Sequence, residues 1–117
     1  QAHVLVCMHQ GSYTKNLTYI RPGGVLVVDS DAVKIGRHVD ARRHALPLSS
    51  TVREELGSTR GVNLAALGAV IGLTGAVSEQ AVRAAIQQRY GQGSPNEKAF
   101  DVGFRFAAPD TDVTKRP

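Results

Sequence analysis

The sequence has one cysteine, no tryptophan and few aromatic side chains, and these absences exclude several classes of site. A single thiol cannot form an internal disulfide, which favours a reducing, cytoplasmic setting. Cys7 lies in an apolar run, so we expect it to be buried and unreactive. The four histidines include no pair at i, i+4 spacing, so the sequence predicts no histidine metal site.

The chain also lacks an apolar run long enough to cross a bilayer, which takes about 20 residues. Its longest uncharged stretch includes residues 62–77, which read VNLAALGAVIGLTGAV and leave no polar stripe at the helical period. We therefore expect a helix that is apolar all round, ends at Gly75 and is buried between layers on more than one side. The apolar run at residues 4–8 has no basic leader, so no secretion signal is predicted.

No sign of charge dominates the sequence. The net charge is +4, and basic residues such as Lys34 and Arg42 alternate with Asp29 and Asp31. A nucleic-acid-binding protein usually gathers its basic residues on one stripe with aromatic residues between them. We therefore expect no nucleic-acid partner, and a chain of 117 residues most simply forms one domain.

The first third of the chain is typical of a parallel sheet. Residues 3–8 and 25–28 are short apolar runs rich in β-branched residues. Between them, Ser12 is expected to cap a short helix, and residues 21–24 (RPGG) are expected to make a sharp break. Residues 25–28 form the kind of strand that is covered on both faces, so the order predicts a three-layer α/β/α fold with a mainly parallel sheet.

The middle of the chain is more polar. Residues 32–43 show no clear period, and we interpret them as a loop or a small hairpin. Residues 45–48 contain a proline, which cannot donate to a ladder, so they are expected to form a short edge strand. A capping box at Thr51 predicts a helix that reaches Leu56 and stops at Gly57.

Two further helices are predicted. Ser78 is expected to cap a helix that ends near Gly91, and Asn96 is expected to cap the last one. That last helix carries Phe100 and Phe104 on one face and Phe106 on another. A helix that is apolar on two sides needs a second covering surface, so we expect these three phenylalanines to form a partner interface.

The residues that could contact a ligand are few. Asp29 follows a buried strand, at the edge where α/β sheets bind ligands, although a loop or helix cap is the simpler interpretation. Asn63 is expected to cap the uncharged helix. Arg60, just before that helix, could reach a neighbouring subunit or a phosphate. Ser12 lacks the context of a nucleophile elbow, so no catalytic residue is predicted.

The order of several segments resembles one enzyme family. The segments are residues 21–30 (RPGGVLVVDS), 46–48 (LPL), 53–57 (REELG), Arg60, 63–68 (NLAALG), 77–79 (VSE), 96–100 (NEKAF) and Gly103. As a set, they resemble the C-terminal part of the gamma domain of 2-oxoacid:ferredoxin oxidoreductases. The resemblance spans residues 1–108 and leaves residues 109–117 as a polar tail or linker.

The resemblance implies a function within a complex. Enzymes of this kind oxidatively decarboxylate a 2-oxoacid, such as pyruvate or 2-oxoglutarate, to an acyl-CoA. They use thiamine diphosphate, iron–sulfur clusters and coenzyme A, and ferredoxin is the acceptor. The implied role of this chain is non-catalytic: it packs against thiamine-binding alpha and beta subunits and helps shape the coenzyme A site. One cysteine cannot supply the four thiolates of a typical cluster.

The sequence departs from the family at its beginning. Family members start with a strand and a glycine-rich turn of the Gly-x-Gly-Gly-x-Gly type, which is absent here. The missing N-terminal half is therefore an expected partner. We expect the isolated chain to be poorly stable, because its central strand would lack neighbours. The alternative is a stand-alone α/β module that binds a ligand or another protein.

Overall fold

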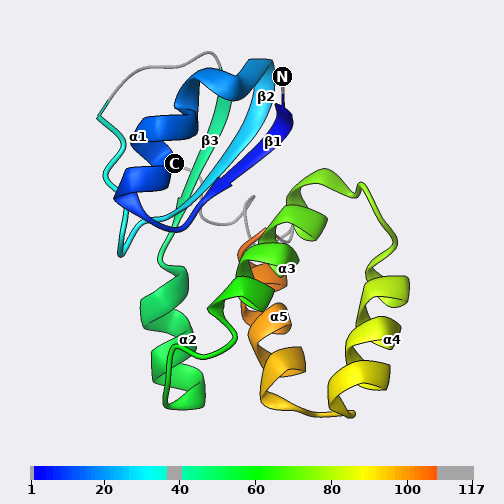
Figure 1. Cartoon of the computed structure of the whole chain (residues 1–117). Coiled ribbons are helices and arrows are strands. Elements are labelled where there is room, and N and C mark those ends of the chain that lie inside the picture. The colour runs from blue at the N-terminus through cyan, green and yellow to red at the C-terminus, as the bar shows by residue number, and fades with distance from the viewer. Residues whose placement is uncertain (1, 37–40, 108–117) are drawn as a thin grey trace, which may run out of the picture. The chain divides into compact units, whose positions relative to one another are not determined.

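The chain forms two compact units, Gln1–Ser49 and Ser50–Pro117, in a computed structural model that describes residues 2–36 and 41–107 (Figure 1). We refer to them as the sheet unit and the helical unit. The sheet unit contains β1 (Ala2–Cys7), α1 (Gln10–Asn16), the 3-10 turn η1 (Leu17–Tyr19), β2 (Ile20–Asp29) and β3 (Ala41–Leu46). The predicted tail at residues 109–117 lies outside the described residues.

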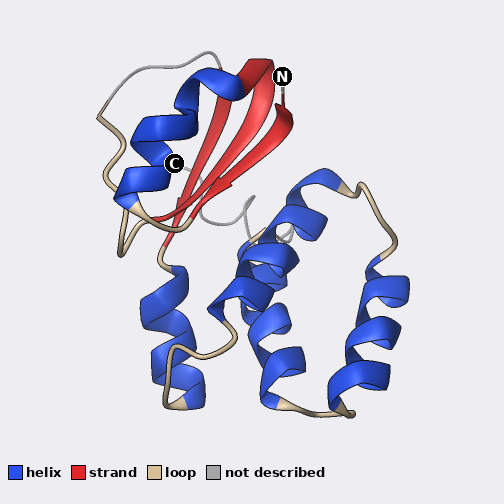
Figure 2. Cartoon of the chain, in the orientation of Figure 1, coloured by secondary structure: helices blue, strands red, loops and turns tan. Residues whose placement is uncertain are grey.

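The sheet has three parallel strands in the order β1-β2-β3 (Figure 2). In its register, Leu26 of β2 lies between Leu5 of β1 and Arg43 of β3. The predicted strands at residues 3–8 and 25–28 are confirmed, as is the α/β class with a parallel sheet. Parallel strands require a crossover, and the segment formed by α1 and η1 supplies the one between β1 and β2.

β2 is buried on both faces, as predicted. Leu26 and Val28 point toward α1 and join an apolar cluster with Tyr13 and Leu17. Val25 and Val27 point to the opposite face, because side chains alternate along a strand, and both are buried as well. A continuous apolar run therefore forms the centre of this sheet.

The predicted break at residues 21–24 is wrong, because these residues lie inside β2 as an irregularity in the ladder. The register moves from Ala2 beside Ile20 to Val4 beside Val25, so the two strands advance by different numbers of residues. Gly23 has a φ of 77°, which favours glycine. The chain therefore bulges at RPGG and continues in the same direction.

Three other predictions about the sheet unit need correction. β2 has a neighbour on each side, so the central strand is not unpaired. β3 begins at Ala41, within the segment that we expected to be a loop, and ends before Pro47. α1 begins at Gln10, so Ser12 lies in its first turn, where the hydroxyl donates to the carbonyl of His9 at 3.0 Å instead of capping the helix.

The helical unit contains the last four helices. They are α2 (Leu48–Leu56, which begins just before the unit boundary), α3 (Val62–Thr74), α4 (Glu79–Tyr90) and α5 (Pro95–Phe106). α2 stops at Gly57 as predicted, where φ is 82° and the amide donates to the Arg53 carbonyl at 2.9 Å. It starts three residues before Thr51, so the predicted capping box lies within the helix. None of the helices described is both long and apolar enough to cross a membrane.

α3 packs on α5 with a close approach of their backbones at two glycines. A Cβ added at Gly103 of α5 would overlap the carbonyl of Ala65, and one added at Gly68 of α3 would overlap the carbonyl of Phe100. α3 ends at Gly75, as predicted. The predicted burial on all sides is wrong, because Leu67 keeps 39% of its surface exposed.

The caps of the last two helices are serines. The Ser78 hydroxyl accepts from the Ala81 amide at 3.3 Å, which confirms the predicted start of α4, and that helix ends at Gly91 as expected. α5 is capped by Ser94, not by Asn96. The Ser94 hydroxyl accepts from the Glu97 amide at 3.2 Å, and a proline occupies the first turn, where its missing N–H costs nothing.

Candidate functional site

The carboxyl end of the central strand holds a buried carboxylate. Asp29 is 1% exposed, and its Oδ1 accepts from the amides of Asp31 at 3.1 Å and of Ser49 at 3.4 Å. Its Oδ2 accepts from the Ser49 hydroxyl. Asp29 therefore closes the turn after β2 and caps the start of α2, which is the simpler of its two interpretations. Both carboxylate oxygens accept hydrogen bonds from neighbouring residues of the fold. Asp29 could therefore affect a ligand only indirectly, by fixing the backbone at this edge of the sheet.

On the other side of the same edge, α1 is tied to the segment that follows β2. The Lys34 amide donates to Gln10 Oε1 at 2.8 Å, and Gln10 Nε2 donates to the Lys34 carbonyl at 3.4 Å. One carboxamide thus pairs both backbone groups of Lys34, much as a neighbouring strand would. This fixes the backbone of Lys34 and leaves its side chain exposed.

A pocket of about 350 Å³ lies beside this contact. Its walls are Gln10, Tyr13, Thr14, Leu17, Lys34 and Gly36. Tyr13 is 4% exposed, and its hydroxyl has no hydrogen-bond partner in the described structure. A buried hydroxyl without a partner costs about 1–3 kcal/mol, so phenylalanine would pack here at a lower cost.

Cys7 lies in the same apolar cluster as Tyr13 and is 1% exposed. Burial raises the pKa of its thiol above the ordinary value, because an apolar surrounding disfavours the thiolate. The thiol therefore stays protonated and unreactive, in agreement with the prediction.

Arg60 and Asn63 lie at the start of α3 in the helical unit, and both are exposed. The N-cap is Gly61, with a φ of 82°, so the expectation that Asn63 caps the helix is wrong. Asn63 is the second residue of α3. The Arg60 amide donates to the Ser58 hydroxyl at 3.2 Å, which orders the turn and leaves the guanidinium at the surface.

The three phenylalanines of α5 have different environments. Phe100 is fully buried, and its ring stacks on that of Phe104 with centroids 6.1 Å apart. The guanidinium of Arg83 lies over both rings, at 5.0 and 5.6 Å. Phe100 therefore belongs to the core and cannot line a partner surface in this fold. Phe104 and Phe106 are only partly buried.

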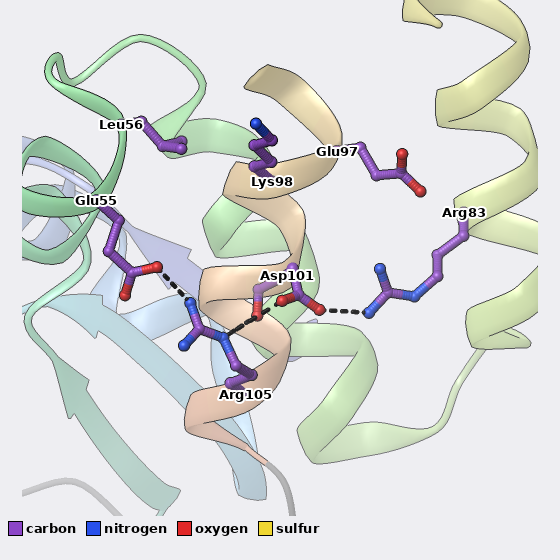
Figure 3. Close-up of a pocket in the computed structure, with 7 residues that line it drawn as sticks. All are labelled: Glu55, Leu56, Arg83, Glu97, Lys98, Asp101 and Arg105. Carbon is purple, nitrogen blue, oxygen red and sulfur yellow. Dashed lines mark hydrogen bonds and ion pairs between the residues drawn. The ribbon is translucent and has the colours of Figure 1, made fainter. Parts of the chain in front are cut away.

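A second pocket, in the helical unit, is lined mainly by charged side chains (Figure 3). Its residues are Glu55, Leu56, Arg83, Glu97, Lys98, Asp101 and Arg105. Figure 3 shows a chain of ion pairs across it, in which Asp101 lies between two arginines. Arg83 binds Asp101 at 2.8 Å and Arg105 binds Glu55 at 2.7 Å, so the pairs connect α4, α5 and α2.

Two side chains that line this pocket have shifted pKa values. Burial alone would lower the pKa of Arg83, but hydrogen bonds and charges from Glu79 and Asp101 outweigh it and raise the value. The pKa of Glu97 is lowered, first because its carboxylate accepts from the Gly93 amide at 2.7 Å and second because it accepts from Gln87 at 2.6 Å. Both residues are therefore fixed in their charged forms near neutral pH.

The charged pocket joins three helices through ion pairs. Within residues 2–36 and 41–107, no group of three or more His, Cys, Asp or Glu side chains could hold a metal ion. The acidic and basic groups of the charged pocket neutralise one another. The i, i+4 pair of Glu79 and Arg83 could have been predicted from spacing, but the pair of Arg83 and Asp101 depends on the packing of α4 against α5.

Comparison with known proteins then identifies the family. The model for the family described as pyruvate ferredoxin/flavodoxin oxidoreductase matches residues 1–106. The chain belongs to this family. The resemblance inferred from the ordered segments is thereby confirmed.

One relative of this chain is the 2-oxoglutarate synthase subunit KorC of Methanocaldococcus jannaschii. The two sequences are 32% identical over 108 residues. That match covers 89% of this chain and 58% of KorC. The solved gamma subunit of the keto/oxoacid ferredoxin oxidoreductase of Geobacter sulfurreducens is 32% identical, with a TM-score of 0.84. It is matched over 92% of this chain and 64% of its own length, so the chain spans about three-fifths of these relatives.

A second solved structure shows the fold alone. It is the 2-oxoglutarate:ferredoxin oxidoreductase of Magnetococcus marinus, solved with 2-oxoglutarate, coenzyme A and succinyl-CoA bound. Its identity to this chain is 24% and its TM-score 0.75, over 92% of this chain and 20% of that one. The same fold thus occurs as a small part of a much longer polypeptide.

Proposed function

We propose that this family member is the non-catalytic gamma component of a 2-oxoacid:acceptor oxidoreductase that converts a 2-oxoacid to an acyl-CoA. The observation that supports the proposal most strongly is the agreement of fold and sequence with a gamma subunit, at a TM-score of 0.84 and 32% identity. The similarity to a 2-oxoglutarate synthase subunit points to the same kind of complex.

In this proposal the chemistry belongs to partner subunits in the cytoplasm. Thiamine diphosphate on the alpha and beta subunits would supply activation of the 2-oxoacid, and the iron–sulfur clusters of the complex would supply electron transfer to ferredoxin. The donor set of this chain does not fit a cluster, because it has one cysteine and that thiol is buried and protonated. Its own work is to hold the assembly together and to complete the coenzyme A site.

Only residues that are exposed at the surface could contact coenzyme A or a partner subunit directly. Arg60 and Asn63 are at the surface, and a guanidinium there can bind a phosphate of coenzyme A or a carboxylate of a neighbouring subunit. Phe104 and Phe106 are partly exposed and are the remaining candidates for the partner interface. Asp29 contributes indirectly, by fixing the carboxyl edge of the sheet.

The test is recovery of the complex from its native host. The tagged chain should co-purify with thiamine-binding partners, and the preparation should reduce a viologen dye when a 2-oxoacid and coenzyme A are both present. Recovery of the chain without such partners, together with ligand binding by the chain alone, would favour the stand-alone module instead.

Arg60→Gln in the complex tests the contact itself, with Arg53→Gln as a control, since Arg53 is an exposed arginine on α2. A phosphate contact predicts a rise of roughly tenfold in the KM for coenzyme A, the size of one charge-assisted hydrogen bond. A subunit contact predicts lower recovery of partners with an unchanged KM. If neither quantity changes, Arg60 has no role in the complex.

A further inference from the structure

α4 is attached to the rest of the helical unit by few buried groups. Among its residues, all of which are described, Ile86 alone is buried, and it shares an apolar cluster with Ile71 of α3 and Phe100 of α5. α3 and α5 contact each other more extensively and fit together at Gly68 and Gly103. The two helices therefore pack through contacts in which α4 takes no part.

The segments at the two ends of α4 contain glycines in the left-handed region. Gly75 before the helix has a φ of 62°, and Gly91 and Gly93 after it have φ values of 98° and 73°. Beyond their chain neighbours, no atom of the described residues lies within 4 Å of a Cβ added at any of the three. Hinges in proteins are usually a few residues at the ends of elements, where changes in φ and ψ are absorbed. Both connections of α4 have this character.

Polar contacts supply much of the remaining attachment of α4 to α5. Arg83 pairs with Asp101 at 2.8 Å (Figure 3), and its guanidinium covers two phenylalanine rings of α5. Gln87 donates to Glu97 at 2.6 Å. Each of these four side chains is partly exposed, so water and ions can replace the contacts when the helix moves away. Separation of α4 therefore leaves no buried charge without a partner.

We propose that α4 is a hinged cover, which swings away from the helical unit as one helix while α3 and α5 stay paired. The contacts that Arg83 and Gln87 make with α5 are its latch. Opening uncovers the apolar surface of Ile71 and Phe100, which is hidden in the closed form, so the position of α4 controls the exposure of Phe100. The proposal does not depend on the proposed function, since it concerns the packing of the helical unit alone.

The test is amide hydrogen exchange of the full chain, followed by NMR at low urea concentrations and under conditions in which closing is faster than exchange. The amides of α4 should be protected at least roughly tenfold less than those of α3 and α5, through an opening that urea promotes only weakly. Equal protection and equal urea dependence in the three helices would overturn the proposal.

Two variants and a control separate an opening of α4 from unfolding of the whole unit. Ala65→Gly weakens α3 within its contact with α5, so it should speed exchange in α3 and α5 about fivefold and leave α4 unchanged. Arg83→Met removes part of the latch and should speed exchange in α4 about fivefold. Arg89→Met, at an exposed position of the same helix, should change nothing.

Two results with these variants would contradict the hinged cover. If Ala65→Gly speeds exchange in α4 as much as in α3, α4 opens only when the whole unit unfolds. If Arg83→Met leaves exchange in α4 at the wild-type rate, the ion pair is not a latch. Either result would overturn the proposal.

Discussion

The two units of this chain bring backbones together by different means. In the helical unit, α3 and α5 approach so closely that only glycine fits at Gly68 and Gly103. In the sheet unit, the strands are joined by their ladders, and the segments that follow them are tied by polar side chains, through Asp29 to Ser49 and through Gln10 to Lys34. Shape therefore limits substitution most severely at Gly68 and Gly103, whereas in the sheet unit hydrogen bonding adds to a milder steric limit at Gly24, where an added Cβ would lie 2.9 Å from the His3 carbonyl oxygen.

The largest expected effect is that of Gly103→Ala in the helical unit. A methyl group there would overlap the Ala65 carbonyl, so the two helices would have to separate. We expect a loss of about 3 kcal/mol or more in the free energy of unfolding, measured by urea titration. The matched control is Gly11→Ala in α1, where nothing lies within 4 Å, and it should gain roughly 0.5–1 kcal/mol. Equal effects at the two positions would contradict the contrast between the units.

Next in size is Asp29→Ala in the sheet unit. It removes three hydrogen bonds and leaves the Ser49 hydroxyl without its acceptor. A loss of about 2–3 kcal/mol is expected, again by urea unfolding. Asp29→Asn keeps one acceptor oxygen and should lose less. If Ala and Asn cost the same, the carboxylate is not acting as a cap.

Arg83→Met should have a smaller effect. It keeps much of the aliphatic stem and removes the pairs with Glu79 and Asp101 and the contact with two phenylalanine rings. Arg83 is only 24% exposed, so we expect a loss of about 1 kcal/mol in thermal unfolding, part of which disappears at high salt. Arg89→Met, at an exposed position of the same helix, should be nearly neutral. A salt-independent loss would assign the effect to packing instead of charge.

The smallest effect concerns pH. The pKa of Glu97 is lower in the folded chain than its ordinary value of 4.5. Its contribution to stability is therefore fully present above the unfolded pKa and is lost as the pH falls through the lower folded value. Glu97→Gln should therefore make the free energy of unfolding depend less steeply on pH over that acidic range. The melting temperature measured as a function of pH follows this change, and Glu54→Gln serves as the exposed control. An unchanged slope would show that the hydrogen bonds from Gly93 and Gln87 do not favour the charged form.

Local signals predicted a good part of this fold. The apolar run at residues 25–28 identified a strand buried on both faces, and Ser78, Gly57 and Gly75 marked helix ends correctly. β3 was predicted only in part: an edge strand was expected at residues 45–48, but the strand spans Ala41–Leu46. Its side chains include exposed Arg42 and Arg43, so its place depends on pairing with β2 and not on its own hydrophobic pattern.

The sites were less accessible to sequence reasoning. The position of Asp29 after a buried strand suggested either a ligand contact or a cap, and the structure shows the cap. The tie between Gln10 and Lys34 joins residues 24 positions apart, which no local spacing indicates. Phe100 was expected at a partner surface because its helix is apolar on two sides, but Arg83 and Phe104 cover it within the unit.

The measurement that tests the central claim most directly is removal of this segment from the oxidoreductase complex that we propose, in its native host. The account predicts that alpha and beta subunits then fail to assemble stably and that 2-oxoacid- and coenzyme A-dependent dye reduction is lost, with both restored when the chain is supplied again. Full activity of a complex that lacks the segment would contradict the account.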